Sequence, residues 1–251
     1  MREVRTFVGQ FVIIAALIVC VSILLRKVGL TGTGGSILAF VLIGGLLFWT
    51  ETVRLRKRGR SIEDAVASFG FYSVDVSDLR LAIYPFRKAG TVRNAVCGNL
   101  HGLQSWIFDY EIPDGEDTIA QTVAAFVVAD ANLPIFELRP RHLDGIRMAT
   151  QNDGFLECVQ FSEVPSFQTS FTLKTSAIEH VQRYFKTDLL EKLLRVEDCK
   201  CIVQGYYTTV VCFVPGTRVA AEELEAFATR CSEVASALFS SATELPLAKL
   251  L

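Results

Sequence analysis

Two apolar runs fill most of the first 50 residues, and a dense group of basic residues follows them at once. The first run, residues 7–25, has only Gln10 and Ser22 as polar interruptions, and about 20 apolar residues are enough for a helix to cross a hydrocarbon core of roughly 30 Å. The second run, residues 35–49, reaches that length when the glycine-rich residues before it extend it to residues 32–50. We therefore predict a hairpin of two transmembrane helices at about residues 7–25 and 32–50.

The basic residues beside the two runs predict the orientation of the hairpin. Lys and Arg favour the cytoplasmic side of a membrane, and Arg2 and Arg5 precede the first run. The second run is followed by a cluster that we call the basic collar: Arg54, Arg56, Lys57, Arg58 and Arg60. The first run is longer than the apolar part of a signal peptide, and no A-x-A-like cleavage site follows it. We expect a multi-pass protein of the cell inner (plasma) membrane with both termini in the cytoplasm, whose basic collar contacts the surface of the lipid bilayer.

The charges divide the chain into two parts of opposite sign. Residues 1–60 hold 9 of the 25 basic and 2 of the 27 acidic residues, which leaves 16 basic and 25 acidic residues in positions 61–251, a net charge of −9. An acidic domain disfavours broad binding to nucleic acid or to anionic lipid. We therefore expect no nucleic-acid partner, and we assign the contact with the bilayer to residues 1–60.

Residues 61–251 are numerous enough for one cytoplasmic α+β domain with a hydrophobic core, or for two lobes that divide near residue 150. Ser61 is in position to cap a short helix that ends near Phe69. An alternation of apolar and polar residues then predicts an antiparallel sheet. We expect its strands at residues 72–76, 92–100, 103–112, 118–130 and 135–139, with turns at His101-Gly102 and at Pro113-Asp114-Gly115.

The later part of the domain mixes strands and helices. Residues 167–175 alternate as a strand, and residues 199–215 resemble a hairpin that turns between Gly205 and Tyr206. Helices are expected at residues 178–185 and, capped by Thr187 and Asp188, through Leu194. A final amphipathic helix carries one apolar stripe, formed by Leu224, Phe227, Cys231, Val234 and Leu238. Strands covered by a C-terminal amphipathic helix define the α+β class.

Three short strings occur in order in the domain, namely Phe108-Asp109-Tyr110, Gln121-Thr122-Val123 and the LPxFxLRP pattern of Leu133 to Pro140. Together with a Pro165-Ser166-Phe167 segment, they resemble the recurring pattern of an uncharacterised family of bacterial membrane proteins. Proteins of that family join N-terminal membrane spans to a soluble domain of this size, and the resemblance covers roughly residues 85–240. It implies a bacterial membrane protein, and it transfers no activity and no catalytic residue.

Two charged residues in these strings are candidate binding residues. On a strand, the rings of Trp106, Phe108 and Tyr110 share one face, which we expect to be core, while Asp109 faces the other way. In the LPxFxLRP strand, Arg139 faces away from the expected core, as Glu137 does. Arg139 therefore either pairs with Asp109 or Glu137 to hold neighbouring strands together, or binds a ligand at the edge of the sheet.

The seven cysteines form no spacing that indicates a disulfide framework, which agrees with a reducing compartment. Cys199 and Cys201 are weak candidates for a metal or redox site, because residues two apart on a strand share one face. Zinc would need further ligands, for which Cys212 and Cys158 are conceivable. Buried small side chains explain the same four cysteines equally well, so no metal and no cofactor is expected.

Motifs of catalysis are missing from the sequence. It contains no P-loop and no G-x-S-x-G elbow, and His101, His142 and His180 occur without a metal-binding or catalytic spacing. We therefore expect a membrane-anchored cytoplasmic interaction or assembly module without catalytic activity, which binds a protein partner or associates with itself. The alternative is a thiol- or metal-dependent enzyme that uses Cys199 and Cys201.

Overall fold

The computed structural model describes residues 33–77, 90–114, 117–144, 157–196 and 200–243, together with the single positions 23 and 27. The chain divides into two compact units, Met1–Arg58 and Gly59–Leu251. The first predicted span, residues 7–25, lies almost wholly outside the described residues.

Helix α2 runs without a break from Thr33 to Ala67. The prediction that Ser61 caps a separate helix is therefore wrong, because good helix-forming residues continue through this stretch and a single interior glycine, Gly59, costs only about 1 kcal/mol. The helix ends where Gly70 adopts a positive φ of 81°. The amide of Gly70 donates to the carbonyl of Ala67 and that of Phe71 to the carbonyl of Val66, a Schellman motif.

No helix within the described ranges is both long and apolar enough to cross a membrane. The predicted second span, residues 32–50, falls on the first part of α2, so its helical state is confirmed. The hairpin of two membrane spans is not found among the described residues, and the membrane anchor stays a prediction.

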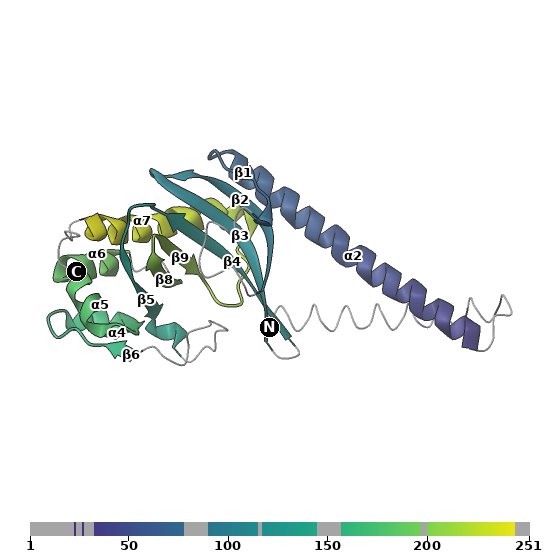
Figure 1. Cartoon of the computed structure of the whole chain (residues 1–251). Coiled ribbons are helices and arrows are strands. Elements are labelled where there is room, and N and C mark those ends of the chain that lie inside the picture. Colours follow the sequence, from purple (N-terminus) through teal and green to yellow (C-terminus); the bar gives the residue numbers. More distant parts are fainter. Residues whose placement is uncertain are drawn as a thin grey trace. The chain divides into compact units, whose positions relative to one another are not determined.

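An antiparallel sheet forms the centre of the second unit (Figure 1). Its strand order in the described residues is β1-β2-β3-β4-β9-β8-β5-β7-β6. The strands are β1 (Tyr72–Ser73), β2 (Thr91–Leu100), β3 (Leu103–Asp114), β4 (Asp117–Val127), β5 (Leu133–Pro140), β6 (Glu157–Val159), β7 (Phe171–Thr175), β8 (Ile202–Tyr207) and β9 (Thr209–Phe213). The five strands predicted first are confirmed, each within three residues at both ends.

Two turns show how local backbone geometry sets the register. His101 and Gly102 have φ values of 53° and 82° between the paired residues Leu100 and Leu103, which confirms the predicted two-residue turn. The hairpin of β8 and β9 is also found, but it turns after Tyr206, which pairs with Thr209, and not after Gly205. Of the other predicted turn, Pro113 and Asp114 belong to β3, and Gly115 lies outside the described residues.

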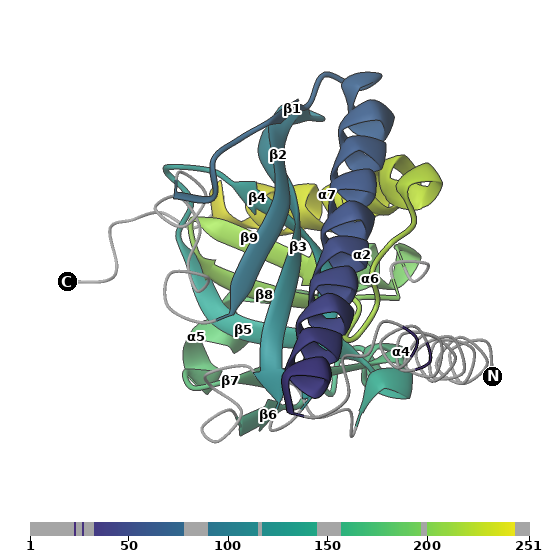
Figure 2. The ribbon, with the colours of Figure 1, turned by 90° about the vertical axis from the view of Figure 1, so that its right-hand side faces the viewer.

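Four further helices lie on one face of the sheet (Figure 2). They are α4 (Pro165–Ser170), α5 (Ile178–Tyr184), α6 (Thr187–Arg195) and α7 (Leu224–Thr243), with short 3-10 turns at Arg141–Leu143 and Ala221–Glu223. The predicted strand at residues 167–175 is wrong in its first part, because residues 167–170 belong to α4 and the strand begins at Phe171. Pro165 occupies the first turn of α4, where a proline favours the start of a helix. Helix α6 begins after Lys186, which makes no side-chain capping hydrogen bond, so the predicted Thr187-Asp188 cap is also wrong.

Both faces of the sheet are buried. On the helix-covered face, Val96, Ile107, Ala124 and Val203 belong to one apolar cluster with α4 to α7. On the opposite face, a second cluster contains Trp106, Phe108 and Tyr110 together with side chains of β2, β4, β8 and β9. The fold is thus α+β, with a large antiparallel sheet and a C-terminal helix, as predicted.

Candidate functional site

The basic collar and the apolar side chains before it lie on α2. Arg54, Arg56, Lys57 and Arg60 are exposed, whereas Arg58 is half-buried. The residues preceding the collar include large apolar side chains with exposed fractions of 40% to 76%: Ile37, Val41, Leu42, Leu46, Phe48, Trp49 and Val53. At 100° per residue these side chains occupy more than one side of the helix. This part of α2 therefore presents an apolar surface where a water-exposed helix would carry polar residues.

Asp109 lies on the helix-covered face, is buried, and accepts hydrogen bonds from the side chains of Asn94 and Thr122. Its Oδ2 accepts a hydrogen bond of 2.9 Å from Nδ2 of Asn94, and its Oδ1 accepts one of 2.9 Å from the hydroxyl of Thr122. Asn94 has a positive φ of 51° at an irregularity in the pairing of β2 and β3, which aims its side chain at the carboxylate. The Thr122 hydroxyl in turn accepts from the amide of Val219, at 3.0 Å. Asp109 thus ties β2, β3 and β4 to the chain segment that leads into α7.

Arg139 lies on the opposite face, so the structure does not bring it to Asp109. Its Nη2 and Nε donate to Oε1 of Glu137, at 2.7 and 3.1 Å, and both side chains are almost completely buried. Oε2 of Glu137 accepts from Nε2 of Gln204 on β8, at 2.9 Å, and the Tyr206 hydroxyl donates to Gln204 Oε1. The predicted pairing of Arg139 with Glu137 is found, and Gln204 extends it to the neighbouring strand. This hydrogen bonding favours the structural role of Arg139 over a ligand site at an exposed edge.

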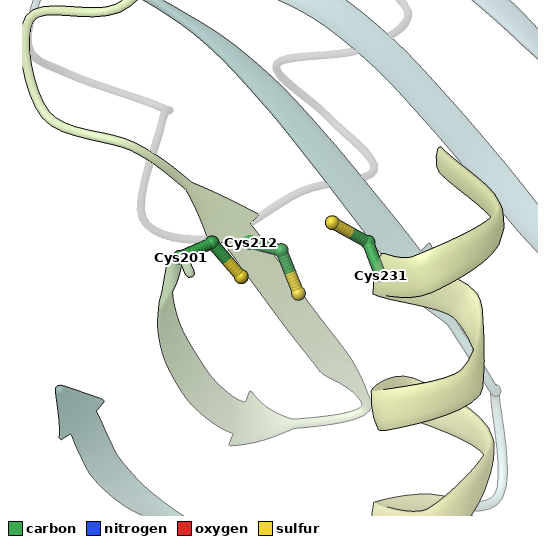
Figure 3. A group of neighbouring side chains, drawn as sticks. All are labelled: Cys201, Cys212 and Cys231. Carbon is green, nitrogen blue, oxygen red and sulfur yellow. The ribbon is translucent and has the colours of Figure 1, made fainter. Parts of the chain in front are cut away.

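Three cysteines converge between the sheet and α7, and each comes from a different part of the fold (Figure 3). The sulfur atoms of Cys201, Cys212 and Cys231 all lie within 4.8 Å of one another, and all three residues are buried. Of the other predicted candidates, Cys158 is exposed on β6 and Cys199 lies outside the described residues.

The sequence had indicated Cys201 and Cys212 for this cluster but not Cys231. The signal for Cys231 was present in the apolar stripe of the last helix, because a residue in that stripe must face the sheet that the helix covers. What the sequence lacked was the position of the stripe along the sheet, which tertiary packing decides.

Cys97 offers a contrast to these three sulfurs. It is buried in the second apolar cluster, on the other face of the sheet. Burial raises the pKa of the Cys97 thiol above its ordinary value, and this effect outweighs the hydrogen bonds from Tyr72 and neighbouring groups that lower it. Cys97 is therefore a protonated thiol at neutral pH and packs as a small apolar side chain.

The histidines form no catalytic arrangement with the groups that contact them in the described residues. Nδ1 of His101 lies 2.8 Å from the hydroxyl of Ser232, which itself donates to the backbone carbonyl of Thr229. The Ser232 hydroxyl proton is therefore used within α7, and its oxygen accepts from the imidazole. His101 fastens the turn between β2 and β3 to α7. His142 is exposed and His180 is half-buried.

The fold places the chain among α+β proteins whose helices cover one face of a broad antiparallel sheet. Neither a protein-family model nor a curated protein matches the sequence. Among solved structures, the fold is similar to the crystal structure of the mycobacterial trehalose monomycolate transport factor A, TtfA, with a TM-score of 0.52 and 16% sequence identity. The similarity covers 76% of this chain and 99% of that chain. At this identity the likeness concerns the fold.

Proposed function

We propose that this chain is a membrane-anchored protein without catalytic activity, whose α+β domain binds a protein partner, or a second copy of itself, within a complex of the inner membrane. The observation that carries the proposal is the exposed apolar surface of α2, where Phe48 and Trp49 are 76% and 66% exposed, followed directly by the basic collar. Apolar side chains in such number call for an apolar environment, and basic residues beside them suit a cytoplasmic membrane surface.

In this proposal the two apolar runs, at about residues 7–25 and 32–50, cross the membrane, and both termini lie in the cytoplasm. The basic collar contacts lipid headgroups, where each Lys or Arg near an anionic surface contributes about 1 kcal/mol. The domain has a net charge of −9, which disfavours a second broad contact with anionic lipid. The anchor therefore holds the domain at the membrane and leaves its surface available to a partner.

The name of the protein with the similar fold is compatible with a membrane-related role, because that protein is a trehalose monomycolate transport factor. In this chain, the buried charged groups Asp109, Glu137 and Arg139 are engaged with protein side chains. These arrangements suit a rigid domain that presents a surface to a partner.

Site-specific photocrosslinking in intact membranes tests the anchor. A benzophenone side chain at Phe48 is expected to form lipid adducts, because this position lies within the proposed span. The matched control is Tyr207, the last residue of β8, which is 56% exposed and is expected to form no lipid adducts. Equal lipid labelling at both positions, or none at Phe48, would contradict the anchor.

Purification of the crosslinked full chain from detergent-solubilised membranes tests the second part of the proposal. The expected result is a defined band of higher mass that contains one recurring partner or a second copy of the chain. Repeated recovery of the chain with neither a partner nor self-association would count against an assembly role. This result would not bear on the membrane anchor, which the photocrosslinking measurement tests separately.

A further inference from the structure

The three converging cysteines are brought together by the fold and not by local sequence. Val203 on β8 pairs with Cys212 on β9, and Cys201 lies two residues before Val203. Cys201 and Cys212 are therefore diagonal neighbours on the helix-covered face of the sheet. Cys231 lies in the apolar stripe of α7 and faces them from the helix (Figure 3).

The spacing of the sulfur atoms is close to that of metal ligands. Metal–sulfur bonds of about 2.3 Å place two sulfurs of one coordination shell about 4 Å apart. The three sulfurs lie within 4.8 Å of one another, so closure around an ion requires shifts of less than about 1 Å. Side-chain rotation of the three cysteines, which lie just before β8, in β9 and in α7, supplies movements of that size.

The surroundings of the sulfurs decide which ion suits them. Cys201, Cys212 and Cys231 are at most 2% exposed, and the side chains of Ala124 and Ala228 belong to the same apolar cluster. Thiolate sulfur is a soft ligand that selects ions such as Cu(I) and Zn(II) over Mg(II) or Ca(II). Three sulfurs complete a trigonal shell for Cu(I), whereas Zn(II) takes four ligands and would bind here with one ligand from outside the three cysteines. The group of potential ligands found among the described residues consists of these three sulfurs.

We propose that Cys201, Cys212 and Cys231 form a three-sulfur site for one thiophilic metal ion, Cu(I) or Zn(II), which fastens the β8–β9 hairpin to α7. Each thiol that becomes a ligand releases its proton to solvent as the metal–sulfur bond forms, so binding weakens as the pH falls. Of the three negative charges that deprotonation leaves in the core, Zn(II) offsets two and Cu(I) offsets one. The site is independent of the proposed membrane anchor.

The test uses the full chain in detergent micelles under anaerobic, reducing conditions. After treatment with a chelator, the protein is loaded separately with Cu(I) and with Zn(II), passed over a desalting column, and analysed for bound metal by mass spectrometry. We expect one ion per chain for at least one of the two metals. Absence of retained Cu(I) and Zn(II) would overturn the proposal.

Cysteine variants identify the ligands. Cys212→Ala and Cys231→Ala are each expected to lower the bound metal at least tenfold. The matched controls are Cys97→Ala, which removes a buried thiol from the other face of the sheet, and Cys158→Ala, which removes an exposed one. Both controls should keep one ion per chain. Equal retention in all four variants, or equal loss in all four, would contradict the assignment.

A measurement on the unaltered chain tests the ligands even if a variant with a substitution in the core does not fold. X-ray absorption of the metal-loaded protein is expected to give a first shell with three sulfurs. A shell without sulfur, or one with four sulfurs, would overturn the three-sulfur site. The variant Cys199→Ala checks the same point, since it is expected to leave the metal content unchanged.

Discussion

The first part of α2 and helix α7 contain similar apolar side chains but differ in where these side chains lie. Leu238 in α7 is completely buried against the sheet, whereas Leu42 in α2 is 52% exposed. The apolar residues of α7 recur at three- and four-residue intervals and form one stripe, while those of α2 occupy more than one side of the helix. A single stripe can be covered by one sheet face. An apolar surface on several sides needs an apolar environment around the helix, and this difference is the basis for the proposed membrane anchor.

The sheet and α2 also differ in the surroundings of their charged side chains, and a matched pair of arginines, Arg139 on β5 and Arg56 on α2, gives the largest expected effect. Arg139→Leu leaves Glu137 buried without its cationic partner, which is expected to lower the free energy of unfolding by about 3–5 kcal/mol. Arg56→Leu removes an exposed charge and should change it by less than about 0.5 kcal/mol. Urea unfolding of the full chain in micelles, followed by near-ultraviolet circular dichroism, measures both. Equal effects of the two substitutions would remove the distinction between buried and exposed charge.

A matched pair of leucines tests the apolar part of the comparison. Leu238→Ala creates a cavity under α7 and is expected to lower the free energy of unfolding of the domain by about 2–5 kcal/mol. Leu42→Ala truncates an exposed side chain, and its expected effect on the same transition is below about 0.5 kcal/mol. The same urea titration applies. A loss of more than about 2 kcal/mol for Leu42→Ala would mean that this side of α2 is part of the folded core.

A pair of glycines tests how tightly the two regions are packed around one added Cβ atom. A Cβ at Gly205 would lie 2.1 Å from Cε1 of Phe136, which packs over β8 from the neighbouring strand, so Gly205→Ala is expected to cost about 1–3 kcal/mol. A Cβ at Gly44 meets no atom within 4 Å, and Gly44→Ala should favour the helix by up to about 1 kcal/mol. Thermal unfolding midpoints compare the two variants. If Gly205→Ala is as stable as the unaltered chain, the close packing of Phe136 against Gly205 is contradicted.

Period-two alternation predicted β2 to β5 because successive side chains on these strands differ in polarity, and it placed Asp109 opposite Trp106 and Phe108. It did not show that both faces of the sheet are buried. Glu137 and Arg139 therefore resembled residues of an exposed or edge position, although they form a buried ion pair to which Gln204 donates a hydrogen bond. Burial of a strand on its second face depends on how the sheet curves and what covers it, which the alternation does not encode.

The candidate cysteine site was predictable only in part, for a related reason. The hairpin placed Cys201 and Cys212 on one face, because strand pairing is a local property of the sequence. Cys231 joins them from a helix that begins eleven residues after the end of β9, and the position at which a helix crosses a sheet depends on packing over the whole face. The helix α4 was missed because Pro165, a helix-start residue, precedes an apolar alternation that is typical of a strand.

The most direct test of the account is alkaline extraction of membranes from cells that produce the full chain, compared with a chain that begins at Glu51. Alkaline carbonate releases peripheral proteins and leaves spanning proteins in the lipid. We predict that the full chain stays in the membrane pellet and that the shortened chain, which lacks the apolar runs and keeps the basic collar, is released. Release of the full chain into the supernatant would contradict the membrane anchor on which the proposed function rests.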